Sequence, residues 1–346
     1  MADFSLDWAY AHGGAAARGM LRATPEDFVV EEDLGFAPDG QGEHVLVQVQ
    51  KRGANTEWVA RQLARFAGVR PMDVSYAGLK DRHALTTQWF SVHLPGRAEP
   101  DWSGFACDEY RVLAAGRHTR KLRRGALAGN RFVIRLHALA GDTGVLAARL
   151  AQIRERGVPN YFGEQRFGHE GGNLARAAEL FAGRRREHDR AKRGMYLSAA
   201  RSYLFNTVLS HRVVQGTWDQ ALAGECLVLD GSASFFRAEA IDGKLQQRLV
   251  QWDIHPSGPL WGRGAPPCGS ALNAMEADLL APHEAFRKGL EQAGMEQERR
   301  PLRLAARDMA WELSGDTLTV SFVLDAGSYA TAVLREAVDT TTQPSP

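Results

Sequence analysis

The hydrophobic and polar positions of the chain predict several β-strands before and after a more helical middle. A β-strand places successive side chains on opposite faces, so alternation of apolar and polar residues indicates a half-buried strand. Five stretches have this alternation or the composition of a strand: residues 26–36, 44–50, 86–94, 130–139 and 318–324. In the stretch 130–139 we expect Phe132, Ile134 and Leu136 to be buried on one face.

Other stretches have helical spacing. Asn55 is a suitable N-cap, and the helix that it begins should stop at Gly68. Further helices are predicted over residues 143–156, 173–183 and 198–214. Ser328 can cap a last helix over residues 329–338. Two loop-rich stretches are expected at 226–236 and 256–269, and a disordered tail at 339–346.

This order suggests that a helix-rich domain is inserted into a mixed α/β one. With 346 residues, the chain is long enough for two domains. No apolar run reaches the length of a membrane span, and the first ten residues lack the layout of an export signal. The three cysteines are far apart and odd in number, which argues against a disulfide framework and a zinc site. We therefore expect a cytoplasmic protein with reduced cysteines and no membrane segment.

The charge is unevenly distributed although the net charge is only +1. Residues 111–135 contain eight Arg or Lys and no Asp or Glu, and a second basic cluster spans residues 183–193. Arginine matches phosphate oxygens with its planar fork and stacks on bases. The two clusters fit a nucleic-acid footprint, although charge alone is equally compatible with a solvated basic surface.

Asp81 is the acidic side chain of a small basic loop, YAGLKDRHALTTQWF, at residues 76–90. Nearby cations would keep its carboxylate ionised, as a nucleophile or a partner of an oxocarbenium ion requires. The competing interpretation is a charged turn that points into water. His83 has no accompanying Ser or Cys motif, so a surface position is the simpler interpretation.

The loop AGLKDRHALTTQ resembles the signature of the TruD family of tRNA pseudouridine synthases. Four more segments resemble that family in the same order: PEDFVVEE at 25–32, GNRF at 129–132, PNYFGEQRFG at 159–168 and GSYATAVLRE at 327–336. One short motif would be weak, but five collinear ones cover nearly the whole chain.

The resemblance implies roles for particular residues. Asp81 would be the nucleophile, and Asn130 would hydrogen-bond to the nucleotide. The slot for a flipped uracil would be lined by Phe28, Phe132 and Tyr329, which could instead be ordinary core aromatics. Arg22 and Lys80 would supply positive charge near Asp81, Arg22 standing where many family members have Lys.

The implied fold is α+β, with a mixed, largely antiparallel sheet in a catalytic domain of residues 1–154 and 304–338 and an inserted domain of residues 155–303. The implied activity is isomerisation of a tRNA uridine to pseudouridine, at position 13 in the D-arm region. It needs no cofactor and no metal. We expect a monomer that contacts tRNA phosphates through Arg120, Lys121, Arg123 and Arg124.

Two other functions are compatible with parts of the pattern. A non-catalytic RNA-binding or RNA-remodelling protein could share the fold, but it would not need an acid at position 81. A nucleoside hydrolase could use Asp81 and His83, but it would require a second acid or metal ligands that the sequence does not offer. For the synthase itself, the sequence leaves open whether Asp81 attacks C1′, adds to C6 or assists elimination.

Overall fold

The computed structural model describes residues 4–342. Their contacts form two compact units, each built from separated parts of the chain. We call them the sheet unit (Ala15–Leu150, Ala306–Gly327 and Ala337 onward) and the helical unit (the described part of Met1–Gly14, with Ala151–Ala305 and Ser328–Glu336). The functional division at residues 154/155 and 303/304 remains a prediction.

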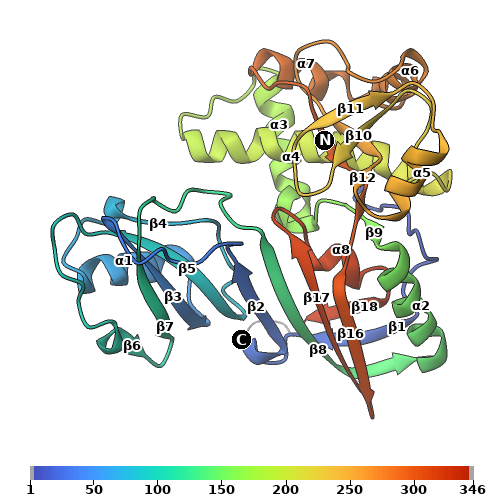
Figure 1. The fold of residues 1–346 in the computed structure, drawn as a ribbon. Coiled ribbons are helices and arrows are strands. Elements are labelled where there is room, and N and C mark those ends of the chain that lie inside the picture. Colours follow the sequence, from blue (N-terminus) through green and yellow to red (C-terminus); the bar gives the residue numbers. More distant parts are fainter. Residues whose placement is uncertain (1–3, 343–346) are drawn as a thin grey trace. The chain divides into compact units, whose positions relative to one another are not determined.

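A large mixed sheet forms the sheet unit (Figure 1). Its path runs β16-β17-β8-β2-β5-β3-β7-β6, with β4 beside β5, β1 beside β8, and β18 beside β1. Pairs β1–β18 and β2–β5 are parallel, and the other strand pairs of this sheet are antiparallel across the described residues. The α+β fold with a largely antiparallel sheet is therefore confirmed.

The strands of this sheet have the following bounds: β1 Ala17–Leu21, β2 Phe28–Asp33, β3 His44–Arg52, β4 Val74–Tyr76, β5 Leu85–His93, β6 Ala106–Cys107, β7 Tyr110–His118, β8 Gly129–Gly141, β16 Arg307–Ser314, β17 Thr317–Asp325 and β18 Val338–Thr342. Helix α1 spans Thr56–Phe66, and α2 spans Thr143–Arg156. Short 3-10 turns lie at Pro25–Asp27, Pro71–Asp73 and Trp102–Gly104.

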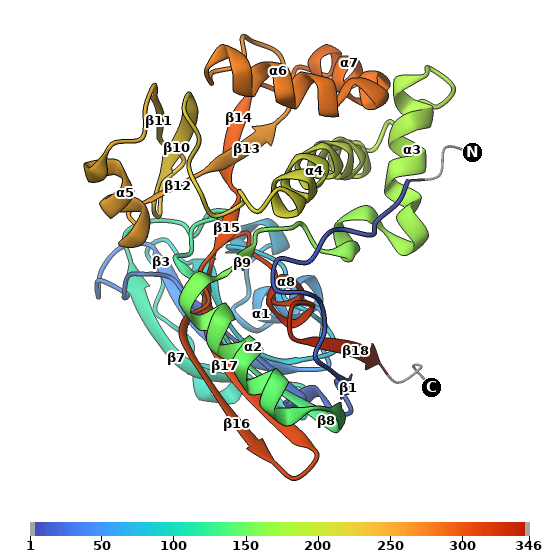
Figure 2. The same cartoon turned by 90° about the vertical axis from the view of Figure 1, so that its right-hand side faces the viewer.

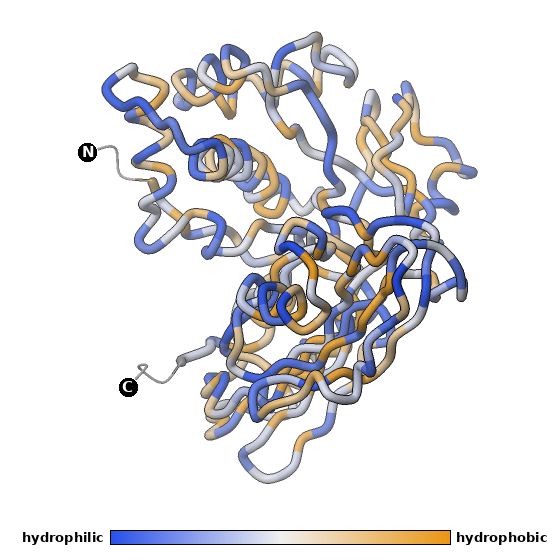
Figure 3. The backbone as a smooth tube through the Cα atoms, turned by 90° about the vertical axis from the view of Figure 1, so that its left-hand side faces the viewer, coloured by the Kyte–Doolittle hydropathy of each residue, from blue (hydrophilic) through white to orange (hydrophobic). Residues whose placement is uncertain are grey.

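Alternation along the strands produces the core of the sheet unit (Figure 3). On β3 the inward residues Val45, Val47 and Val49 are buried together with Val59 and Leu63 of α1. Burial of apolar surface at about 25 cal/mol per Å² is the main force that holds the helix on this face. On β8 the residues expected to be buried, Phe132, Ile134 and Leu136, are buried. Asn55 is the N-cap of α1, and Gly68 follows its end with φ of 62°.

The helical unit packs around the long helix α4, Arg190–Val214 (Figure 2). Its other helices are α3 Gly172–Phe181, α5 Gly243–Val250, α6 Ser270–Leu279, α7 Glu284–Gln292 and α8 Ala330–Leu334. Its strands are β9 Val158–Pro159, β10 Glu225–Leu229, β11 Phe235–Ala238, β12 Ile254–His255, β13 Ser257–Leu260, β14 Glu298–Pro301 and β15 Arg303–Leu304. Its 3-10 turns are Glu164–Phe167, His169–Gly171 and Ala281–His283.

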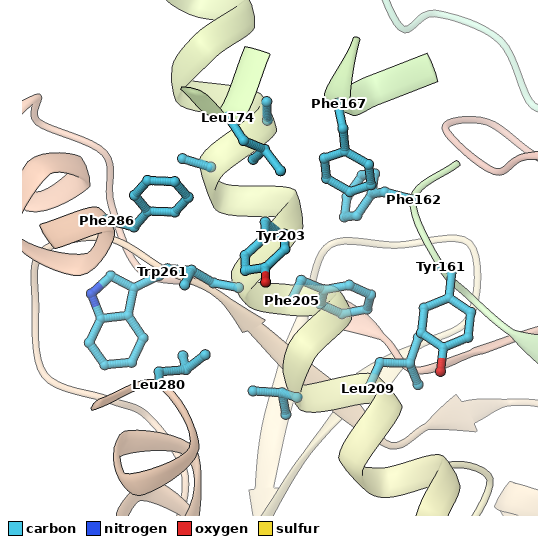
Figure 4. Close-up of a cluster of buried hydrophobic side chains, with 14 of the residues drawn as sticks. Tyr161, Phe162, Phe167, Leu174, Tyr203, Phe205, Leu209, Trp261, Leu280 and Phe286 are labelled. Carbon is cyan, nitrogen blue, oxygen red and sulfur yellow. The ribbon is translucent and has the colours of Figure 1, made fainter. Parts of the chain in front are cut away.

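An aromatic core stabilises the helical unit (Figure 4). Tyr203 of α4 makes edge-to-face contacts with Phe167 and Phe286. The centroid of its ring lies 6.4 Å from that of Phe167 and 6.2 Å from that of Phe286. Arg212 and Glu225 form a buried ion pair with an N–O distance of 3.1 Å. Removing one member of such a pair leaves an uncompensated buried charge, so this pair fixes α4 against β10.

Three predictions from the sequence need correction. Both stretches expected to be loop-rich contain strands: 226–236 holds most of the antiparallel pair β10–β11, and 256–269 holds β13, which pairs with β14. The last helix covers only Ala330–Leu334, and its N-cap is Tyr329 instead of Ser328. Residues 339–342 are not a disordered tail, because they belong to β18, whose backbone pairs with β1. The remaining residues of the predicted tail, 343–346, lie outside the described part of the chain.

Candidate active site

The loop of residues 77–84, between β4 and β5, is held by hydrogen bonds from side chains of two other segments, β5 and the start of α1. Gln88 of β5 donates from Nε2 to the carbonyl of Gly78 at 2.6 Å. Thr56, at the start of α1, donates to Gln88 Oε1 and accepts from the backbone N–H of Lys80, each at 3.0 Å. Because these bonds fix the main chain on both sides of residue 79, the loop presents Asp81 in a defined position.

The carboxylate of Asp81 is bound by two donors. Arg22 Nη2 lies 2.5 Å from Asp81 Oδ2, and the backbone N–H of His83 donates to Oδ1 at 2.9 Å. Asp81 exposes 23% of its side chain and Arg22 18%, so the acid is reachable but does not project into bulk solvent. Charge-assisted hydrogen bonds of this kind are stronger than bonds between neutral groups, so they hold the carboxylate in place. The solvated-turn interpretation of Asp81 is therefore not supported.

Arg22 also connects Asp81 to an aromatic group. Its guanidinium carbon lies 4.3 Å from the centroid of the Phe28 ring, a cation–π contact. The Phe28 ring lies edge to face against Phe132 of β8, with ring centroids 6.2 Å apart. The Phe132 ring in turn contacts Phe322 of β17, with centroids 5.6 Å apart. The two phenylalanines named by the family resemblance therefore lie in one aromatic group on the same sheet as Asp81. Both are buried.

Lys80 and Asn130 are linked through Glu32 of β2. Lys80 Nζ donates to Glu32 Oε1 at 2.7 Å, and the other carboxylate oxygen accepts from the backbone of Trp89 at 2.8 Å. Asn130 is the register partner of Glu32 on β8. Its Oδ1 is buried and has no hydrogen-bond partner within residues 4–342. A buried acceptor without a partner is costly, so Asn130 is suited to accept a bond from a ligand.

Lys51 belongs to the same group and was not predicted. It continues the Val45, Val47 and Val49 face of β3, is almost fully buried, and donates from Nζ to the carbonyls of Ala54 at 2.8 Å and Asp81 at 3.0 Å. Burial lowers the pKa of Lys51 to about 8, against the opposing attraction of Asp81. The available signal was that Lys51 directly follows the predicted strand 44–50, in line with its apolar face.

The basic residues expected to contact RNA lie in the segment between β7 and β8. Arg120, Lys121, Arg123 and Arg124 are all exposed. Arg124 stacks over Tyr76, with its guanidinium carbon 5.0 Å from the ring centroid. The segment also bonds to the Asp81 loop, since Gly125 N–H donates to the carbonyl of Ala77 at 2.8 Å.

Tyr329 belongs to the helical unit. Its hydroxyl accepts from Arg166 Nε at 3.0 Å and Nη2 at 2.5 Å, while Arg166 Nη1 donates to Ser198 at 2.9 Å. Gly163 packs against the ring, because a Cβ there would lie 3.2 Å from Tyr329 Cδ1. Asp81, Arg22, Phe28, Phe132 and Asn130 all lie in the sheet unit, whereas Tyr329 lies in the helical unit, where its ring also meets Phe162 edge to face at 6.1 Å between centroids.

The described residues offer neither a membrane span nor a metal site. No helix of residues 4–342 is long and apolar enough to cross a membrane. No group of three or more His, Cys, Asp or Glu side chains among the same residues is arranged to hold a metal ion. His83 is exposed, and its backbone N–H is the group that contacts Asp81.

The fold is that of a pseudouridine synthase. The structure aligns with the crystal structure of a TruD protein from Methanosarcina mazei with a TM-score of 0.72, at 22% identity and over 95% of each chain. A family model described as tRNA pseudouridine synthase D (TruD) matches residues 8–180 and 173–337, so the chain belongs to the TruD family. This confirms the resemblance found in the motifs.

Close relatives agree with this assignment. The chain is 53% identical to a tRNA pseudouridine synthase D from Methylococcus capsulatus, over 95% of this chain and 93% of the relative. It is also 53% identical to the protein of that name from Nitrosococcus oceani, over 98% of this chain and 96% of the relative.

Proposed function

We propose that this protein converts a uridine of tRNA to pseudouridine, with Asp81 as the nucleophile and the base flipped out of the RNA. Membership of the TruD family supports the activity and the tRNA substrate. The assignment of the nucleophile to Asp81 depends on one observation: Arg22 and the His83 N–H hold its carboxylate in place. Asp81 lies in the same unit as Phe28, Phe132 and Asn130.

The reaction is an isomerisation in which the uracil is detached at N1 and rejoined to the sugar through C5. The C5 hydrogen leaves as a proton and N1 acquires one, so no atom is lost and no electron acceptor is needed. An ionised Asp81 can attack C1′, add to C6, or assist elimination by stabilising a cationic sugar. The hydrogen bonds that hold its two oxygens reduce the reorganisation that each of these steps requires.

The aromatic group and Asn130 suit a flipped uracil. Extruding a base costs a few kcal/mol of lost stacking, which contact with aromatic side chains offsets. Phe28 and Phe132 would supply that contact, and the Asn130 oxygen can accept the N3–H of uracil. Phe132 cannot exchange a proton, so the C5 proton must leave to another group. From the resemblance we place the target at position 13 and assign Tyr329 a contact to the nucleotide.

The chain offers less support for the two other functions. A protein that only binds RNA has no use for a carboxylate fixed by an arginine and held in a loop with several anchoring bonds. A hydrolase would need a second acid positioned for water activation. The carboxylate of Glu32, which pairs with Lys80 next to Asp81 in the sequence, is already bonded to Lys80 and the Trp89 N–H.

The test is conversion of an unmodified tRNA transcript, followed by digestion to nucleosides. Wild type and the control Asp108→Asn should form pseudouridine, while Asp81→Asn should be at least about 1,000-fold slower, as for loss of a nucleophile. Asp108 is exposed in the β6–β7 turn, which makes it a matched control. Product from Asp81→Asn at the wild-type rate would contradict the proposal, and release of free uracil by wild type would indicate a hydrolase.

A transcript with cytidine in place of uridine 13 tests the position. We expect no pseudouridine in that transcript, and product at an unchanged level would show that the target is elsewhere.

We further infer a monomer in the cytoplasm. The free cysteines, of which Cys107 is exposed and Cys226 and Cys268 are buried, support a reducing compartment. Sedimentation at micromolar concentration should give the mass of a single 38.0 kDa chain.

A further inference from the structure

The sheet unit contains a cavity of about 750 Å³ at the end of β7, apart from the Asp81 loop. Two segments supply most of its walls: the one that follows β2 and the one that joins β7 to β8. Its lining residues are Phe36, Leu46, His118, Thr119, Arg120, Lys121, Leu122, Arg123 and Ala126.

The segment that carries Phe36 is anchored to β7 by its backbone. Gly40 N–H donates to the carbonyl of Arg117 at 3.0 Å, and Asp39 accepts from the hydroxyl of Thr119 at 2.7 Å. Gly42 has φ of 95°, and a Cβ at this position would lie 2.6 Å from the carbonyl oxygen of His118. Only glycine allows this close approach at that backbone conformation, so the wall is a built feature of the fold.

The cavity has an exposed aromatic wall and an apolar floor. The Phe36 ring stacks on His118 with centroids 5.2 Å apart and planes 21° from parallel. Phe36 is nevertheless 45% exposed, whereas Leu46 and Leu122 are buried beneath it. A large exposed ring with one face already stacked offers its other surface to a flat, apolar ligand.

Three basic side chains lie beside the aromatic wall of the cavity. Arg120, Lys121 and Arg123 line the cavity and are exposed, and the run 111–135 to which they belong has no acidic residue. A flat apolar surface next to several cations matches the two parts of a nucleotide: a base that stacks and a phosphate that requires positive charge. A peptide or lipid tail would match the apolar floor but would leave these charges unused.

We propose that this cavity is a second nucleotide site, which takes one unpaired nucleotide of the substrate RNA with its base on Phe36 and its phosphates on Arg120, Lys121 and Arg123. This proposal depends on the proposed function because it takes RNA as the ligand. It does not depend on the chemistry at Asp81. The segment bonds to the catalytic loop at Ala77 and to the end of β2 at Asp33, through the N–H groups of Gly125 and Ala128. RNA bound in the cavity is therefore bound by a segment whose backbone is hydrogen-bonded to the loop that carries Asp81.

The experiment measures the affinity of tRNA and of a labelled pentauridylate for variants built on Asp81→Asn, which prevents turnover. Phe36→Ala should weaken both by about 10-fold, in line with the loss of one stacked base, and Phe36→Tyr should restore them. Phe235→Ala is the control, because Phe235 is an exposed aromatic (39%) of the helical unit. A pentamer in which every residue is abasic should bind the Asp81→Asn parent and its Phe36→Ala variant equally, because no base is left to stack.

Each outcome separates the site from the catalytic proposal. The nucleotide site would be overturned if Phe36→Ala and wild type bound tRNA and the pentamer with equal affinity, while the double variant Arg120→Ala with Arg123→Ala bound both more weakly. That result would leave an electrostatic surface only. Phe36-dependent binding by a protein that makes no pseudouridine would retain the site and reject the proposed activity. With Asp81 intact, Phe36→Ala should raise KM and leave kcat unchanged.

Discussion

At the scale of single residues, Arg22 connects the charge of Asp81 to the aromatic group. Its guanidinium pairs with Asp81 and lies over Phe28, so one planar group makes a charged and a stacking contact at once. It does so with φ of 62°, a left-handed conformation that is uncommon for a residue with a side chain. Such backbone conformations persist where the surrounding structure over-determines them, as at functional sites.

Arg22 variants separate the two contacts. Arg22→Met should lower the single-turnover rate by about 100-fold, because Asp81 loses its partner and its position. Arg22→Lys should keep most of the activity, since an ammonium can pair with the carboxylate although it lacks the fork. A rate for Arg22→Met within twofold of wild type would show that the ion pair is unimportant for the reaction.

Lys51 makes a prediction for the pH dependence of stability. Burial lowers its pKa to about 8 in the folded state, while the unfolded chain binds the proton up to about 10.5. Between these values the unfolded state holds more protons, so the free energy of unfolding should rise with pH, by at most about 1.4 kcal/mol per unit. Below pH 8 the cost of burying the charge is fully present.

Denaturant titrations of wild type and Lys51→Met across pH 7 to 10.5 measure this effect. The difference between the two proteins should grow in favour of wild type from pH 8 upward. A constant difference would show that Lys51 has an ordinary pKa in the folded protein.

The residue scale also shows what sequence can locate. Asp81, Phe28, Phe132 and Asn130 were named from short motifs, and the structure places all four in the sheet unit. Lys51 was not named, because its contact with the catalytic loop depends on how β3, α1 and the loop meet. No local pattern encodes such a contact, although a lysine among alternating valines was visible.

At the scale of elements, alternation located five strands of the sheet unit but missed others, among them β1 and β10, which are short and also have buried positions. Strands β2, β3, β5, β8 and β17 were found because one face of each is apolar. Strand β18 carries a run of threonines and pairs with β1 at the sheet margin, so its signal is only weakly apolar. The predicted last helix was too long, because residues 335–337 form a turn and β18 begins at Val338.

The β7–β8 segment is the element from which we expect the salt dependence of tRNA binding. Arg120→Ala with Arg123→Ala should weaken binding and reduce the slope of log K against log salt by about 1 to 2, one unit per lost phosphate contact. Arg61→Ala with Arg65→Ala, two exposed residues of α1, removes the same charge elsewhere and is the control. An unchanged slope in the first double variant would remove this segment from the RNA interface.

At the scale of the whole molecule, the two units do not follow the order of the chain. Residues 328–336 come after the last long strand of the sheet unit, yet their contacts place them in the helical unit, with the segment before residue 15. Hydrophobic patterning identified an insertion but could not assign these two short segments. The assignment depends on contacts such as those of Arg335 with the carbonyls of Trp8 and Ala9.

Tyr329 gives a prediction at this scale, because it belongs to the helical unit. If its ring contacts the nucleotide, Tyr329→Ala should lower kcat/KM by about 10- to 100-fold, as for the loss of one aromatic stacking partner. Tyr329→Phe should lose less, since the ring remains and only the bond from Arg166 is removed. Equal kcat/KM for wild type and Tyr329→Ala would exclude a role for this residue.

The most direct test of the whole account follows the hydrogen at C5. Conversion of uridine to pseudouridine releases it, so tRNA labelled with tritium at C5 of its uridines reports the reaction by tritium in the solvent. Under single-turnover conditions with protein in excess, wild type and Asp108→Asn should release the tritium of one uridine per tRNA. Asp81→Asn should bind the same tRNA with similar affinity and release none in that time; release at the wild-type rate would contradict the assignment of Asp81.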